Sequence, residues 1–130
     1  MIRRIIIYLI TVLLISVSIA AEENNFVIKD IGEDFYFTWS SNTEPDLAGY
    51  RLYMSTESYK YTFGKGHEFA EFGLITESPR YSMNKEGTFY FVLTAFDTEG
   101  FESNPSMEVY AVIINKPPKN VINLDMSLSL

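Results

Sequence analysis

The clearest β-strand signal in the chain is Gly87-Thr-Phe-Tyr-Phe-Val-Leu-Thr-Ala-Phe-Asp97, which runs into the turn-forming residues Thr98-Glu-Gly100. Successive side chains of a strand point to opposite faces of its sheet. One face of this run carries Phe89, Phe91, Leu93 and Ala95. Alternation of this kind predicts a long central strand that packs tightly on one side, and we expect the rest of the chain to cover that side.

Shorter alternating runs flank this strand. The further predicted strands are Asn25–Lys29, Asp34–Ser40, Asp46–Met54, Glu77–Met83 and Ser106–Ile114. Residues 55–66 alternate at aromatic positions, which indicates a short edge strand, whereas residues 67–76 have no clear period and indicate an irregular connection or a weak strand. About seven short antiparallel strands with turn signals between them predict an all-β, immunoglobulin-like two-sheet sandwich. Its predicted core residues are Phe37, Trp39, Tyr50, Leu52, Phe89, Phe91, Leu93 and Ala95.

The chain begins like an exported protein. Met1-Ile-Arg-Arg4 is a short basic region, and an uncharged apolar run from Ile5 to Ala21 follows it. This pattern is typical of a secretory signal peptide, and the small residues Ser18 and Ala20 predict cleavage after Ala20. The alternative is an uncleaved N-terminal anchor, since about 20 apolar residues can span a bilayer. In both cases we expect a secreted or periplasmic domain that meets a membrane only through an uncleaved N-terminal segment.

The charge and the cysteine count narrow the function classes. The 130 residues include 10 Lys and Arg against 17 Asp and Glu. Removal of residues 1–20 takes away Arg3 and Arg4 and leaves 8 basic residues against 17 acidic ones, a formal net charge of −9. An acidic domain is a poor partner for nucleic acid or anionic membrane surfaces. There is no cysteine, which excludes disulfides, thiolate metal sites and a cysteine nucleophile, and no cofactor is expected.

Several motifs occur in a characteristic order. They are Phe37-Thr-Trp39, Pro45-Asp-Leu-Ala-Gly-Tyr-Arg-Leu-Tyr53, Gly87–Asp97, Gly100, Glu102-Ser103 and Pro105-Ser106. Over residues 26–115 this order resembles a bacterial fibronectin type III domain. The resemblance implies a sandwich in which strands A, B and E face strands C, C′, F and G, with Trp39 as the core tryptophan of strand B. The chain departs from the family at Phe89, where the family usually has a tyrosine whose hydroxyl ties down a corner.

Residues 116–130 follow the domain as a separate part. Asn115-Lys-Pro-Pro-Lys-Asn120 is linker-like, and apolar residues then alternate at Leu124, Met126, Leu128 and Leu130. Within the resemblance, this part matches the linker and first strand of a following repeat. We expect either the remnant of such a repeat or a strand that pairs with an exposed sheet edge, in the same chain or on a partner.

No set of residues in the sequence predicts catalysis. His67 is the only histidine, and it stands in a glycine-rich loop without evident partners. The motifs G-x-S-x-G and H-E-x-x-H and a phosphate-binding glycine loop are all absent. We therefore expect a protein that is not an enzyme.

Two regions are candidate binding sites. The loops at one end of such a sandwich carry five carboxylates, those of Glu44, Asp46, Asp97, Glu99 and Glu102. These carboxylates could bind Ca²⁺, although acidic loops are also often only solvated. The second region is an aromatic set that could stack on sugar rings or anchor a protein, or else close the sandwich edge; it comprises Tyr53, Tyr59, Tyr61 and Phe63.

These observations predict an exported, non-enzymatic β-sandwich module that binds or spaces proteins or polysaccharides at the cell envelope. The alternative is an assembly subunit whose C-terminal strand pairs with the sheet edge of a neighbour, and the sequence leaves the oligomeric state open.

Overall fold

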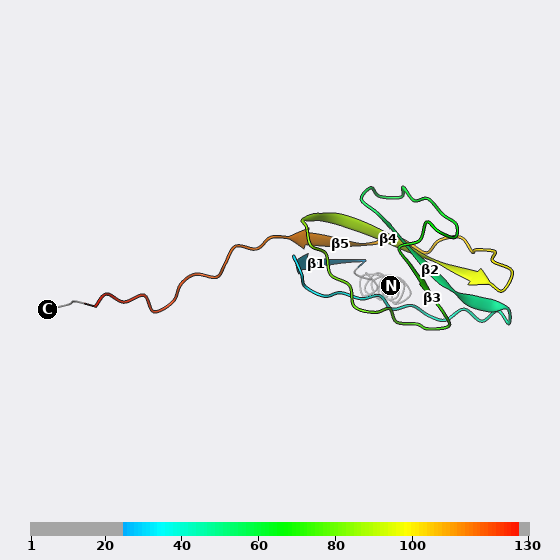
Figure 1. Cartoon of the computed structure of the whole chain (residues 1–130), viewed down its shortest axis with the longest axis horizontal. Coiled ribbons are helices and arrows are strands. Elements are labelled where there is room, and N and C mark those ends of the chain that lie inside the picture. The colour runs from blue at the N-terminus through cyan, green and yellow to red at the C-terminus, as the bar shows by residue number, and fades with distance from the viewer. Residues whose placement is uncertain (1–24, 128–130) are drawn as a thin grey trace, which may run out of the picture.

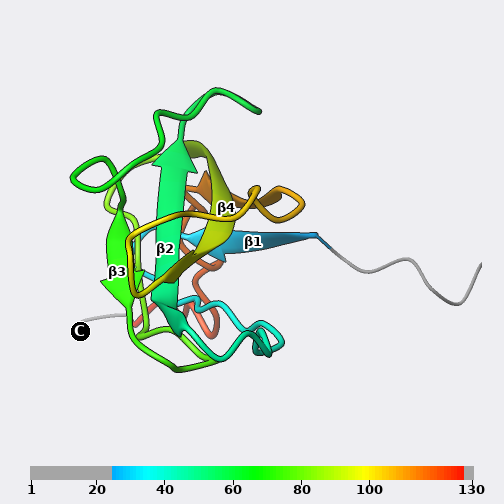
Figure 2. The same cartoon turned by 90° about the vertical axis from the view of Figure 1, so that its right-hand side faces the viewer.

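The computed structural model describes residues 25–127, and its strands form one five-stranded sheet in the order β1-β5-β4-β2-β3. Figure 2 shows β3, β2 and β4 side by side. The strands are β1 (Phe26–Asp30), β2 (Leu47–Ser55), β3 (Ala70–Phe72), β4 (Gly87–Asp97) and β5 (Val109–Ile114). Within these residues no helix is long and apolar enough to cross a membrane. The predicted signal segment, residues 1–20, and the last three residues of the tail lie outside the described part.

The central strand β4 has the bounds that the sequence predicts, and it pairs with antiparallel neighbours on both sides. Leu52 of β2 lies opposite Leu93 of β4, and Phe89 of β4 lies opposite Ala111 of β5. Because side chains opposite each other share a face, these registers bring the alternating apolar residues of three strands together on one side of the sheet.

A second layer faces this apolar side, as the lower part of Figure 1 shows. Residues 34–40 and 76–83 run past each other and meet at the bridges Phe35–Tyr81 and Thr38–Glu77. Between the layers lies the buried cluster of Phe35, Tyr50, Leu52, Phe72, Phe89, Phe91, Ala111 and Ile113. The predicted all-β class and the two-layer immunoglobulin-like arrangement are confirmed.

The strand count differs from the prediction, because the second layer is bridged without forming regular strands. The amide of Phe37 donates to Ser78 Oγ at 2.9 Å instead of to a backbone carbonyl, and the next residue, Pro79, has no amide to donate. The regular ladder is therefore interrupted after one bridge. Five strands result where about seven were predicted.

Both edges of the sheet also differ from the prediction. β1 pairs with β5 in parallel, with Phe26 opposite Tyr110, whereas antiparallel pairing was expected. Gly32, with φ of 83°, lets the chain turn from the sheet into the second layer directly after β1. At the other edge, residues 56–69 are not a strand, since Tyr59 has φ of 56° and cannot continue an extended ladder. The short edge strand is β3, within the segment expected to be irregular or weakly extended.

Candidate functional site

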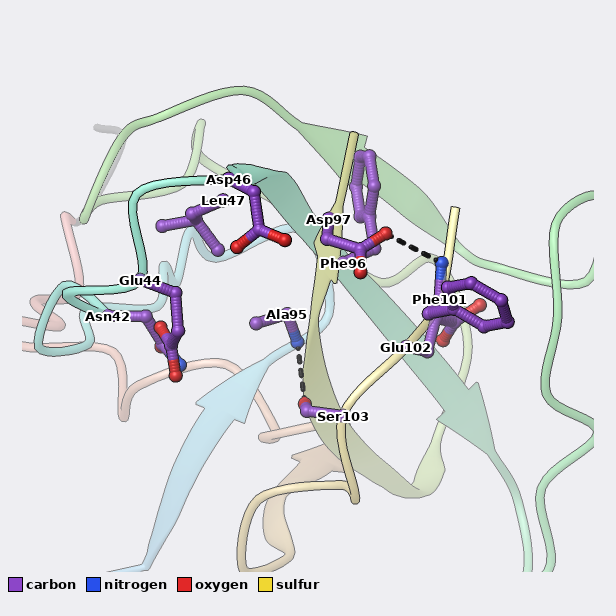
Figure 3. A pocket seen from close by; sticks show the side chains of 10 residues that line it. All are labelled: Asn42, Glu44, Asp46, Leu47, Ala95, Phe96, Asp97, Phe101, Glu102 and Ser103. Atoms are coloured by element: carbon purple, nitrogen blue, oxygen red, sulfur yellow. Dashed lines mark hydrogen bonds between the residues drawn. The ribbon is translucent and has the colours of Figure 1, made fainter. Parts of the chain in front are cut away.

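The acidic loop end of the domain contains a shallow hollow of about 210 Å³. Its wall includes Glu44, Asp46, Asp97 and Glu102 but not Glu99. In Figure 3, Glu44 lies on one side of β4, and Phe101 and Glu102 lie on the other. The loops therefore meet at one end, as predicted, but their carboxylates are spread around the hollow.

Two carboxylates of this hollow, those of Asp97 and Glu102, bind groups of the domain itself. Asp97 Oδ1 accepts hydrogen bonds from the amides of Glu99 at 2.9 Å and Phe101 at 3.0 Å, which closes the turn after β4. Figure 3 shows the bond with Phe101. Within residues 25–127, no group of three or more acidic or histidine side chains could hold a metal ion. The structure does not assemble the predicted calcium site. His67 is an exposed residue of the turn that begins at Gly64.

Glu102 belongs to a buried ionic network on the outer face of the sheet. Arg51, which is only 4% exposed, donates to Glu102 at 2.6 Å and to Glu71 at 2.9 Å. The hydroxyls of Tyr53 and Thr94 donate to the other oxygen of Glu102 at 2.7 and 2.8 Å. The loop after β4 is thereby fastened to the centre of β2 and β4.

The network sets the charge state of its members. Burial raises the pKa of Glu102, but hydrogen bonds from Tyr53, Thr94 and Arg51 outweigh it and leave that pKa below its usual value. Burial disfavours the charged form of Arg51 as well and by itself lowers the pKa of this residue. The hydrogen bonds with Glu71 and Glu102 outweigh burial and raise the pKa above its usual value. An ion pair whose charges are fixed by mutual hydrogen bonds has a structural role, because it offers no group that exchanges protons near neutral pH.

The predicted aromatic set does not form one surface. Tyr53 is 1% exposed and belongs to the network of Glu102. Tyr61 donates its hydroxyl to Glu108 Oε2 at 2.6 Å, and burial together with this bond raises the pKa of Tyr61. Only Tyr59, at 74%, and Phe63, at 44%, expose much of their rings. The set mainly closes the outer face of the sheet.

Glu108 holds the loop 56–63 over the sheet. Its carboxylate accepts hydrogen bonds from Ser58 Oγ at 2.6 Å, from the amide of Tyr59 at 2.8 Å and from the hydroxyl of Tyr61. Burial raises the pKa of Glu108, but these three donors outweigh burial and leave that pKa below its usual value. Sequence reasoning missed this residue, since nothing local distinguishes one glutamate before a strand from another.

A third region, which the sequence did not indicate, lies along one side of the sandwich between the layers. Three hollows of about 170, 130 and 370 Å³ follow one another there. The first and second share Phe37, Thr38, Phe91 and Val109, and the second and third share Trp39, Leu93 and Ser106. Because they share walls, they form one groove, which we call the side groove.

The side groove explains why part of the predicted core is not fully covered. Tyr50, Leu52, Phe89 and Phe91 are buried in the central cluster, whereas Phe37, Trp39, Leu93 and Ala95 pack against it half-buried. Of these four, Phe37, Trp39 and Leu93 line the second hollow. The indole Nε1 of Trp39 is buried and has no hydrogen-bond partner among the described residues.

One wall of the side groove is a free backbone edge of the extended residues 36–40. Phe35, Phe37 and Trp39 direct their backbone hydrogen bonds toward residues 76–81. The alternate residues Tyr36, Thr38 and Ser40 take part in no backbone hydrogen bond within residues 25–127. In an extended chain, alternate residues direct their amides and carbonyls to opposite sides, so these three point to the side where the sandwich is open.

Comparison with known proteins adds one structural neighbour. No protein family model matches the sequence, and no curated protein matches it significantly. Among solved structures, the chain is similar to a fibronectin(III)-like module of CbhA from Clostridium thermocellum, with a TM-score of 0.49 and 13% identity. The match covers 75% of this chain and 96% of that one.

Proposed function

We propose that this protein is an exported, non-enzymatic binding module of the cell envelope, and that its partner is an extended polypeptide seated in the side groove. The observation that carries the proposal is the free edge at Tyr36, Thr38 and Ser40, bordered by apolar hollows. The predicted signal segment provides the reason for placing the module outside the cytoplasm.

A free edge beside apolar hollows is suited to strand addition. In this mode, backbone hydrogen bonds supply affinity, and pockets for alternate side chains supply specificity. The hollows of about 130 and 170 Å³ are close in size to an apolar cavity of about 150 Å³ that takes up benzene. Each can therefore hold one apolar side chain of an incoming strand.

The remaining surface favours a polypeptide over a polysaccharide. Sugar rings stack on exposed, neighbouring aromatic faces, but Tyr53 and Tyr61 are held in two separate networks, and only Tyr59 and Phe63 of the set expose much of their rings. The buried charged groups, Arg51 with Glu102 and Glu108 with its three donors, are satisfied within the domain, which supports a module without catalysis. A polysaccharide partner remains the second expectation from the sequence, and no observation in the structure favours it.

Trp39 provides a direct test, because it is the only tryptophan and lines the side groove. Residues 22–116 contain every member of the buried cluster and can be used alone. A library of extended peptides is selected against this domain, and selected peptides are titrated while the emission of Trp39 is recorded. We expect saturable changes in emission, and no such change with soluble polysaccharides.

Thr38→Pro and Thr38→Val form a matched pair for this test. Proline removes the amide on the free edge, and it is tolerated in edge strands whose amide faces solvent, whereas valine keeps the amide. We expect binding at least tenfold weaker for Thr38→Pro and unchanged for Thr38→Val, with circular dichroism showing that both variants fold. The proposal is refuted if no peptide changes the emission, or if both variants bind equally.

A further inference from the structure

The segment after β5 is an apolar strand sequence that the domain does not cover. Figure 1 shows it leaving the end of β5 and running away from the sheet. Ile122, Leu124 and Met126 are 79%, 88% and 83% exposed. The sequence Ile122-Asn-Leu-Asp-Met-Ser-Leu-Ser-Leu130 alternates strictly between apolar and polar residues. Such a segment is a liability in water unless another chain pairs with it.

The segment leaves β5 at the end that the side groove does not reach. The groove is lined by Ser106 before the strand and by its first half as far as Ala111, whereas the segment departs after Ile114. Lys116 is tied to Asp30 at the end of β1 by its amide and its ammonium group. The following Pro117-Pro118 favours an extended chain. This geometry directs the segment away from the groove of its own domain.

We propose that residues 122–127 of one copy add as a strand to the side groove of a second copy, so that the chains assemble head to tail. This inference rests on the proposed function and names the partner of the same groove. Three alternate apolar side chains span about 13 Å, which matches the free edge from Tyr36 to Ser40. The intervening polar residues Asn123, Asp125 and Ser127 then face solvent.

A contact between two different surfaces of the same chain is heterologous and remains open at both ends. A copy whose groove is filled still presents its own strand, and a copy whose strand is docked still presents its groove. The expected product is therefore a series of oligomers whose mean length rises with concentration. A closed dimer of fixed size is not expected.

Light scattering of residues 22–130 over a range of concentrations tests this assembly. We expect a mass that rises to at least twice that of the monomer. Leu124→Asp/Met126→Asp places charges on the apolar positions of the strand, and we expect a monomer at every concentration. Asn123→Asp/Ser127→Asp adds the same charge on the polar positions and is the matched control, which should assemble like the unaltered chain.

A mixing experiment separates the two surfaces. Thr38→Pro carries an intact strand and a blocked edge, and Leu124→Asp/Met126→Asp carries an intact groove and a defective strand. We expect each alone to be monomeric and their mixture to stop at one-to-one dimers. The inference is overturned if the unaltered chain is monomeric throughout, if the aspartates on the apolar positions do not reduce assembly, or if assembly survives Thr38→Pro.

The peptide titrations distinguish failure of this inference from failure of the proposed function. If selected peptides bind residues 22–116 but the full domain does not assemble, the groove takes a strand from a different protein, and only the inference fails. If the chain is monomeric but Leu124→Asp/Met126→Asp changes the emission of Trp39, the strand fills the groove of its own copy. This result also overturns the proposal of head-to-tail assembly. If neither peptides nor assembly occur, both proposals fail.

Discussion

Replacing Arg51 with methionine tests whether Glu102 is held by a buried ionic network. Arg51 contacts Glu102 and Glu71 and lies 4.2 Å from the centre of the Phe96 ring. Methionine keeps most of the apolar contact but removes the positive charge. The carboxylate of Glu102 then stays in a nearly buried position with only the hydroxyls of Tyr53 and Thr94 as donors.

The size of the effect follows from the burial of each contact. Removing one partner of a buried ion pair costs about 3–5 kcal/mol, and the side chains of Arg51 and Glu102 are only 5% and 15% exposed. Glu71 is more exposed, and an exposed pair contributes about 1 kcal/mol or less. The two hydroxyl donors remain, so we expect a loss of about 3 kcal/mol in the free energy of unfolding. This corresponds to a fall in Tm of roughly 10–20 °C for a domain of this size.

The loss should depend on pH with a defined sign. In the unaltered domain the pKa of Glu102 is lowered, so its contribution is present above the unfolded value of about 4.3 and disappears as the pH falls through the lowered pKa. Without Arg51 the pKa of Glu102 rises, and protonation at a higher pH relieves the unpaired charge. The difference between the two proteins should therefore be largest at neutral pH and shrink below about pH 5.

Urea unfolding followed by the emission of Trp39 measures these differences from neutral pH down to pH 4. Arg51→Lys, which keeps the charge, is the control and should lose less stability than Arg51→Met. On a Glu102→Gln background, Arg51→Met should cost at least about 1 kcal/mol less than in the unaltered chain, because the coupled charge is absent. A loss below about 1 kcal/mol, or one that is unchanged from neutral pH to pH 4, would refute the reasoning.

Three further predictions concern the loops, the sheet and metal binding. Glu108→Gln should lower the free energy of unfolding by about 1–3 kcal/mol, since charged hydrogen bonds are lost; hydrogen exchange of the Tyr59 amide should also accelerate, and unchanged exchange would contradict the role of Glu108. Gly49→Ala places a Cβ atom 2.1 Å from the carbonyl oxygen of Phe72, so thermal unfolding should show that the free energy of unfolding falls by roughly 3 kcal/mol or more. Gly73→Ala, whose Cβ atom meets open space, is the control and should change this free energy by less than about 0.5 kcal/mol. Equal losses in the two variants would disprove the clash. Calcium chloride at millimolar concentration should leave Tm unchanged, because the carboxylates of the acidic loop end do not come together. A saturable rise in Tm would contradict this and show that the domain binds Ca²⁺.

Local sequence patterns were enough to predict the main strands. β4 has the predicted bounds, and β2 and β1 deviate by only one residue at either end, because alternation of apolar side chains is a property of neighbouring residues. The predictions failed where a distant contact decides the conformation. Residues 55–66 alternate like a strand, but the loop is held at Tyr59 by Glu108, 49 residues further along the chain.

The sequence by itself determined the all-β class, the central strand and the absence of cysteine chemistry, since each depends on composition or on a local period. Only the tertiary structure decided which carboxylates become part of buried hydrogen-bond networks. From the sequence alone, Glu102 is indistinguishable from a solvated loop residue. In the structure, the alignment of β2 with β4 places Arg51, which is 51 positions away in the sequence, beside it. The side groove is also tertiary in origin. It exists because β1 pairs with β5 and leaves the edge at residues 36–40 uncovered, and this pairing joins residues that are more than 80 positions apart in the sequence, such as Phe26 and Tyr110.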